Sequence, residues 1–212
     1  MSRLKTIASI AVSSLLLLLI VIKIADIRQH KAITIKSEQL LLEIFSEGEE
    51  IIIGNNEAKK TLIVFYDYNC AYCRSFFANY YPAIYDEFVK TGALRLILKP
   101  VNLGNDITIT YAYRLLPCLY DIGVFDDLHQ LLLDNPDLIF SSDFEIFINT
   151  LVAENPSIEE CVISRYDDAT GDENKAQLKK LGLSGTPTFV IGNKVFTGKI
   201  EPKIIRDILH KK

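Results

Sequence analysis

The pattern of apolar and polar positions divides this chain into an apolar N-terminal run, two stretches of mixed strand and helix, and a helical stretch between them. Residues 61–66 are continuously apolar and rich in β-formers, which is typical of a strand buried on both faces. Residues 74–90 carry aromatic and aliphatic side chains at helical spacing, interrupted by Pro82, and residues 94–98 predict the next strand. A strand, a helix and a strand of these lengths predict a βαβ unit.

The second half of the chain begins with helices and returns to β structure near its end. Residues 188–191 and 195–197 predict a hairpin, and residues 201–210 predict a closing helix. The fold class is therefore α/β, with one sheet whose two halves are separated by a helical insertion. The insertion is helical in pattern over residues 106–180, with one expected apolar face formed by Ile107, Tyr111, Leu115 and Cys118.

The N-terminal segment predicts the compartment. Arg3 and Lys5 precede residues 7–22, which are apolar apart from serines, and this order is typical of an export signal whose front stays in the cytoplasm. At 1.5 Å per residue the run reaches roughly 24 Å. Residues 21–26 offer no convincing cleavage site, so we expect an uncleaved anchor in the inner membrane and a periplasmic domain. A cleaved signal that releases a soluble periplasmic protein is the alternative.

The rest of the chain is expected to follow this anchor in order. Residues 33–45 predict an amphipathic helix that leads to a turn at residues 47–48. The expected divisions are an anchor and linker at 1–31, an N-terminal arm and first α/β half at 32–105, the helical insertion at 106–180, and the second half at 181–212.

Charge and histidine spacing exclude two classes of partner. The 212 residues carry a formal net charge of −4, and lysine and arginine are scattered, so the chain has no basic surface for a nucleic-acid backbone. His30, His129 and His210 lie far apart, and we interpret each as a surface or helix residue instead of a metal ligand. We expect neither nucleic acid nor a bound metal.

The pair Cys70 and Cys73 carries the candidate chemistry. It follows the predicted strand 61–66 directly and opens the predicted helix, so the two sulfurs can reach a disulfide and the helix N-terminus favours a thiolate on Cys70. The thiolate is the attacking species in disulfide exchange. A structural disulfide or half of a zinc site is the other interpretation, but the second pair of ligands that zinc needs is missing.

A second signal lies at Thr186 and Pro187, immediately before the predicted strand 188–191. Pro187 either marks an ordinary turn or forms a cis peptide bond that exposes the backbone of Thr186 to an extended substrate. Tyr68 and Tyr72 flank the cysteines, and they are either core residues or an apolar lip for unfolded chains.

Two stretches together carry a family resemblance. Residues 67–74 (DYNCAYCR) and 182–192 (GLSGTPTFVIG) resemble the DsbA-like branch of the thioredoxin superfamily, thiol-disulfide interchange proteins of the bacterial envelope. Residues 54–58 (GNNEA) are similar to the segment before the first strand in that family. The resemblance extends from about residue 54 to the C-terminus, and the helical insertion falls where the family has one.

The resemblance implies a thioredoxin fold with an inserted helical subdomain, in which Cys70 is the nucleophile and Cys73 the resolving cysteine. It also implies that Thr186 and Pro187 form the cis-proline loop. We expect this loop and the neighbouring Tyr72 to bind substrate, and we expect no cofactor beyond the redox-active disulfide. Cys118 and Cys161 are, by spacing alone, either buried free thiols or a bonded pair. Some DsbA-like relatives from α-proteobacteria resemble this chain in having a second, non-catalytic bridge there, which implies the bonded pair.

Two features of the sequence depart from the family pattern. Ala71 and Tyr72 stand where many strong oxidases have Pro-His, so a weaker oxidant is expected. Val64 stands where the family tends to have a buried acid, so proton transfer to Cys73 would use water or Asp67.

Three functions are consistent with these residues. The first is an oxidase that introduces disulfides into exported cysteine-containing proteins and is reoxidised by a membrane quinone reductase resembling DsbB. The second is a reductase or isomerase of the same fold. The third is a binding module, a chaperone or metal carrier, that uses the fold without turnover. Replacing Cys70 by Ser separates them, because only the third keeps its activity.

Overall fold

The structure is a computed structural model that describes residues 14–17, 33–45, 51–166 and 173–210. Of the expected anchor at residues 7–22, only 14–17 lie within this range, and they are helical. The turn expected at residues 47–48 lies outside the described residues. Within the four described ranges, no helix has both the length and the apolar character to cross a membrane.

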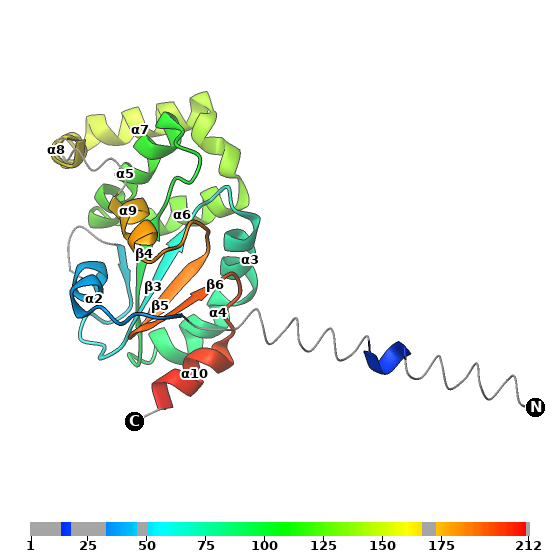
Figure 1. Ribbon diagram of the computed structural model, residues 1–212. Coiled ribbons are helices and arrows are strands. Elements are labelled where there is room, and N and C mark those ends of the chain that lie inside the picture. Colours follow the sequence, from blue (N-terminus) through cyan, green and yellow to red (C-terminus); the bar gives the residue numbers. More distant parts are fainter. Residues whose placement is uncertain (1–13, 18–32, 46–50, 167–172, 211–212) are drawn as a thin grey trace, which may run out of the picture.

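Among the described residues, six strands form one sheet in the order β1-β6-β5-β3-β4-β2 (Figure 1). The central strand β3 pairs in parallel with β4 and antiparallel with β5, and the other neighbours are antiparallel. The strands are β1 (Ile33–Thr34), β2 (Ile51–Ile53), β3 (Thr61–Tyr66), β4 (Arg95–Pro100), β5 (Thr188–Ile191) and β6 (Lys194–Thr197).

The helices lie before, between and after these strands. Those preceding β4 are α2 (Glu38–Phe45), α3 (Ala71–Asn79), α4 (Tyr81–Ile84) and the π-helix η1 (Tyr85–Val89). Those following it are α5 (Ile107–Asp121), α6 (Phe125–Asp134), the 3₁₀ helix η2 (Pro136–Phe140), α7 (Ser142–Glu154), α8 (Ser157–Tyr166), α9 (Glu173–Lys180) and α10 (Pro202–His210).

The alternation of side chains along β3 divides the core into two layers. Leu62 and Val64 pack into the larger cluster with residues of α3, α5, α6 and α10, whereas Ile63 and Phe65 pack into the smaller one with residues of α2 and α9. The prediction of a strand buried on both faces is confirmed, because five of its six residues are buried. Figure 1 shows α5, α6, α7 and α8 gathered beyond one end of the sheet.

The predicted βαβ unit is present as β3, α3 and the parallel strand β4. Its helix was expected over residues 74–90, but α3 begins at Ala71 and the helical path is divided at Tyr80. Pro82 lies in the first turn of α4, where its missing N–H leaves no hydrogen bond unmade.

Two further expectations are corrected. The helix expected over residues 33–45 begins only at Glu38, because Ile33 and Thr34 pair with β6. The apolar face expected on α5 is wrong at its first half, since Ile107 is 76% and Tyr111 39% exposed. The helix turns other side chains inward there, among them Ile109, Ala112 and Tyr113.

Candidate active site

Cys70 and Cys73 lie at the N-terminus of α3, directly beyond the end of β3. Cys70 is the N-cap residue, and its carbonyl accepts hydrogen bonds from the N–H groups of Cys73 and Arg74 at 3.0 and 3.1 Å. Cys70 is half-buried and Cys73 fully buried, and both are free thiols. One sulfur is therefore accessible to an incoming group while the other lies one helical turn deeper.

The loop before β5 lies against Cys70. Because Phe65 at the end of β3 pairs with Thr188 at the start of β5, the residues that precede Thr188 come next to the cysteines. The Thr186–Pro187 peptide bond is cis. The Cys70 thiol donates a hydrogen bond to the Thr186 carbonyl oxygen at 3.2 Å, across 116 residues of sequence. The structure thus brings together the two signals that the sequence singled out.

Burial dominates the chemistry of Cys73. Burial raises the pKa of this thiol, and the nearby Asp67 backbone and Thr186 side chain oppose the rise. The Thr186 hydroxyl is buried and has no hydrogen-bond partner within the described residues. It therefore stands beside Cys73 while the carbonyl group of the same residue contacts Cys70.

Asp67 organises the turn that leads into the cysteines. Its Oδ1 accepts hydrogen bonds from the N–H of Asn69 at 2.8 Å and from the hydroxyl of Tyr113 at 2.7 Å. Its carbonyl oxygen accepts the N–H of Cys70 at 3.0 Å. Tyr113 comes from α5 and also accepts the N–H of Tyr68 at 3.0 Å, so one hydroxyl of the helical region joins two residues of this turn.

Tyr68 is fully buried, and its role as part of an apolar lip is therefore ruled out. Its hydroxyl shares a hydrogen bond with Nδ1 of His129 at 2.6 Å, and its carbonyl accepts one from Nη1 of Arg74 at 2.7 Å. Together with the bond from its N–H to Tyr113, these contacts occupy all of its polar groups. Tyr72, in contrast, is 75% exposed in the first turn of α3, and it is the aromatic side chain at the cysteines that an approaching chain can contact.

His129 is a residue whose place the sequence did not reveal. It lies on a helix, α6, but it is buried there and stacks on Phe125 with ring centroids 4.9 Å apart. Burial lowers its pKa to about 3, so the imidazole is neutral. Its Nε2 is buried without a hydrogen-bond partner in the described structure.

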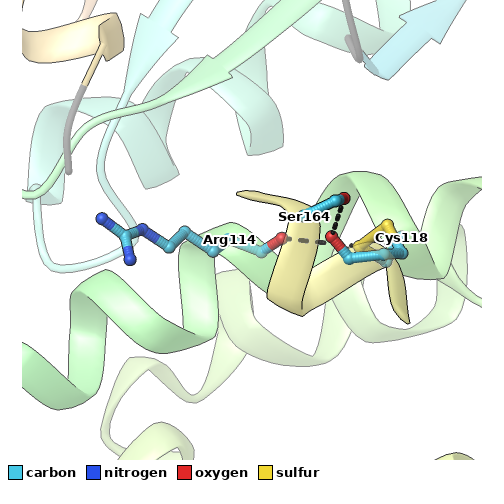
Figure 2. Close-up of a disulfide and its surroundings, with 4 residues drawn as sticks. Arg114, Cys118 and Ser164 are labelled. Carbon is cyan, nitrogen blue, oxygen red and sulfur yellow. Dashed lines mark hydrogen bonds between the residues drawn. A yellow bond between two sulfur atoms is a disulfide. The ribbon is translucent and has the colours of Figure 1, made fainter. Parts of the chain in front are cut away.

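Cys118 and Cys161 form a disulfide, away from the candidate redox pair. The bond joins α5 to α8, with the two Cα atoms 6.0 Å apart (Figure 2). Cys161 is also fixed through its carbonyl oxygen, which accepts a hydrogen bond from the Ser164 hydroxyl at 2.7 Å. The disulfide therefore links two helices of the region between β4 and β5.

The described residues bring no three histidine, cysteine or acidic side chains together in a way that could hold a metal ion.

Comparison with known proteins agrees with this architecture. A family model described as Thioredoxin matches residues 46–211, whereas no curated protein matches the sequence. Among solved structures, oxidised BdbD from Bacillus subtilis is similar at 16% identity and a TM-score of 0.59, over 84% of this chain and 96% of that one. The thiol-disulfide exchange protein alpha-DsbA2 from Wolbachia pipientis is similar at 20% identity and a TM-score of 0.58, over 81% and 90%. A periplasmic thioredoxin-like protein from Salmonella enterica serovar Typhimurium is similar at 19% identity and a TM-score of 0.56, over 82% and 95%.

Proposed function

Since this chain belongs to the thioredoxin family, we propose that it is a protein thiol-disulfide oxidoreductase whose redox pair is Cys70 and Cys73. The observation that carries the proposal is the contact between the half-buried Cys70 thiol and the Thr186 carbonyl oxygen, with Cys73 buried behind it. An accessible sulfur beside a backbone carbonyl group, with a second sulfur buried behind it, suits disulfide exchange with a peptide.

In the proposed oxidase reaction, the protein starts in its oxidised form, with a disulfide between Cys70 and Cys73. A substrate thiolate attacks Cys70, the Cys70–Cys73 bond breaks, and the sulfur of Cys73 leaves and takes up a proton. Burial raises the pKa of Cys73 and thereby favours this protonated form. A second substrate thiolate then attacks the substrate sulfur of the mixed disulfide and releases Cys70. The substrate loses two electrons and the pair gains two.

Substrate binding is proposed at the loop formed by Thr186 and Pro187, with Tyr72 beside it. The backbone of this loop can pair with an extended chain, and the exposed ring of Tyr72 adds apolar contact area. No bound cofactor enters this mechanism, because the electrons are carried by the two sulfurs.

The preferred role is that of an oxidase for exported cysteine-containing proteins, reoxidised by a DsbB-like quinone reductase in the membrane. A reductase or isomerase is the second candidate. It is favoured by the residues between the cysteines, Ala71 and Tyr72, which supply no cationic ring to hold a thiolate. The third candidate, a chaperone or metal carrier without turnover, needs neither sulfur to react.

We further propose that the domain works in the periplasm and is anchored in the inner membrane by its N-terminal segment. Arg3 and Lys5 before the apolar residues 7–22 support export and anchoring, and the disulfide between Cys118 and Cys161 is of a kind found mainly in oxidising compartments.

The deciding measurement is the reduction potential of the Cys70 and Cys73 pair, obtained by equilibrating the purified full chain with glutathione buffers. A value near about −120 mV identifies a disulfide donor, whereas one near about −270 mV identifies a reductant and reverses the proposed direction. A Cys70→Ser variant is the control for turnover. If the native chain exchanges disulfides with model substrates no faster than this variant, the redox proposal is wrong and a binding module without turnover is favoured.

A further inference from the structure

The turn before the redox pair is tied to a tyrosine of the helical region. The hydroxyl of Tyr113, on α5, donates to the Asp67 carboxylate and accepts from the Tyr68 N–H. Burial and the neighbouring Asp67 carboxylate both raise the pKa of Tyr113, so the hydroxyl keeps its proton and remains a donor. Its ring also lies edge-on to that of Tyr68, with centroids 5.6 Å apart.

Asp67, which Tyr113 holds, is connected to both sulfur-bearing residues. Its carbonyl oxygen accepts the Cys70 N–H, and its backbone lowers the pKa of the Cys73 thiol against the larger effect of burial. Its carboxylate is nearly buried, at 7% exposure. We reason that a carboxylate charge with little access to water, on the residue whose carbonyl holds the Cys70 N–H, disfavours a second negative charge on the Cys70 sulfur.

We propose that Tyr113 is a positioning residue for the redox pair, which acts through Asp67 by compensating the carboxylate charge. The inference rests on the proposed function and deepens it, because it assigns to the helical region a role in setting the reduction potential of the Cys70 and Cys73 pair. The hydrogen bond from Tyr113 makes a thiolate on Cys70 less costly and so stabilises the reduced form.

The proposal predicts opposite effects for two substitutions. Tyr113→Phe removes the donor and leaves the carboxylate charge, so the reduced form is destabilised and the equilibrium constant with glutathione shifts toward the protein disulfide. Asp67→Asn removes the charge and keeps an oxygen for Asn69 and Tyr113, so the constant shifts the other way. Each shift should be about threefold or more, and alkylation of Cys70 at neutral pH should slow in Tyr113→Phe and quicken in Asp67→Asn.

The experiment is a double-mutant cycle of the full chain, read out by equilibration with glutathione and by alkylation rate. Because Tyr113 acts through the carboxylate, Tyr113→Phe in the Asp67→Asn background should change the constant by less than about twofold. Tyr111→Phe is the matched control, since Tyr111 lies on the same helix and is exposed, and it should behave as the native chain.

A merely structural role predicts a different result. Tyr113→Phe would then lower the denaturation midpoint while leaving the equilibrium constant within about twofold of the native value, or would shift it equally in both backgrounds. Either outcome overturns the proposal. If the native chain itself exchanges no disulfide with glutathione, it is the proposed function that fails. Circular dichroism of each variant identifies one that has not folded. If Tyr113→Phe has not folded, Asp67→Asn still tests the proposal, because an unchanged equilibrium constant in that variant overturns it.

Discussion

The hydroxyl of Tyr68 lies 2.6 Å from Nδ1 of His129, a residue 61 positions further along the chain. Both side chains are buried, and the Tyr68 hydroxyl also lies 3.2 Å from that of Tyr66. A polar chain thus runs from the last residue of β3, through the turn before Cys70, to helix α6. In a low-dielectric interior such a chain stabilises one arrangement of the elements that it joins, because each broken link leaves a polar group unpaired.

Replacing Tyr68 by Phe removes the hydroxyl and leaves Nδ1 of His129 buried without its partner. We expect the free energy of unfolding to fall by about 1–3 kcal/mol, the usual cost of an unsatisfied buried group, as measured by urea denaturation. Tyr72→Phe is the control and should change stability by less than about 0.5 kcal/mol, because this side chain is exposed. Equal losses in the two variants would contradict the importance of the buried contact.

His129 should make the stability of the protein depend on pH. Burial lowers its pKa to about 3, below the value of about 6.5 in an unfolded chain. The unfolded state therefore binds more protons between these pH values. This contribution is fully present above about pH 6.5 and is lost as the pH falls toward 3, by at most about 1.4 kcal/mol per pH unit.

The measurement compares the native chain with His129→Gln by denaturation at several pH values. Since the variant lacks this titration, its stability should fall less on acidification, and the difference between the two proteins should shrink from about pH 6.5 to 4. A difference that is constant over this range would show that the fold does not hold His129 neutral.

Loss of the bridge between Cys118 and Cys161 should destabilise the native chain without removing its redox activity. Closing a loop of 43 residues contributes up to about 4 kcal/mol in the chain-entropy model. We expect a double serine variant to show a loss of this order in denaturant, while its Cys70 and Cys73 pair still exchanges with glutathione. A variant that is stable but redox-inactive would contradict this expectation and would indicate that the Cys118–Cys161 disulfide takes part in the redox reaction.

The two cysteines of the pair should differ in their capacity to trap a substrate. With Cys73→Ser, the mixed disulfide between Cys70 and a substrate lacks its resolving thiol and should accumulate, whereas Cys70→Ser lacks the accessible sulfur. Non-reducing electrophoresis after exposure of each reduced variant to an unfolded protein that carries disulfides reads out the adduct, because the Cys70 thiolate attacks a substrate disulfide and one substrate sulfur leaves as a thiol. Adducts of similar amount in both variants would reject the assignment of Cys70 as the attacking residue.

Local patterns predicted much of what positions the site. Residues 61–66 match β3 at both ends, because a short apolar run followed by a polar turn has few alternatives to a buried strand. The proximity of Cys70 to the loop at Thr186 was also expected, but from the family resemblance, since no local pattern relates positions 116 residues apart.

The polar network behind the cysteines could not be predicted in the same way. Tyr113 was missed because the inward face of α5 was assigned to Ile107 and Tyr111, which are exposed. His129 carried a signal that was present in the sequence: it shares the apolar face of α6 with Phe125, Leu128 and Leu132. Its partner Tyr68, however, follows only from the tertiary packing of two distant elements.

The outer strands of the sheet have a consequence for a protein that is proposed to handle unfolded chains. Among the described residues, the edges are formed by β1 and β2, which contain two and three residues. An open edge presents unpaired backbone groups and acts as a template for any extended segment, including those of a client polypeptide. Edge strands this short offer an unfolded substrate few backbone groups to pair with. The substrate can therefore dissociate after disulfide exchange instead of extending the sheet into an aggregate.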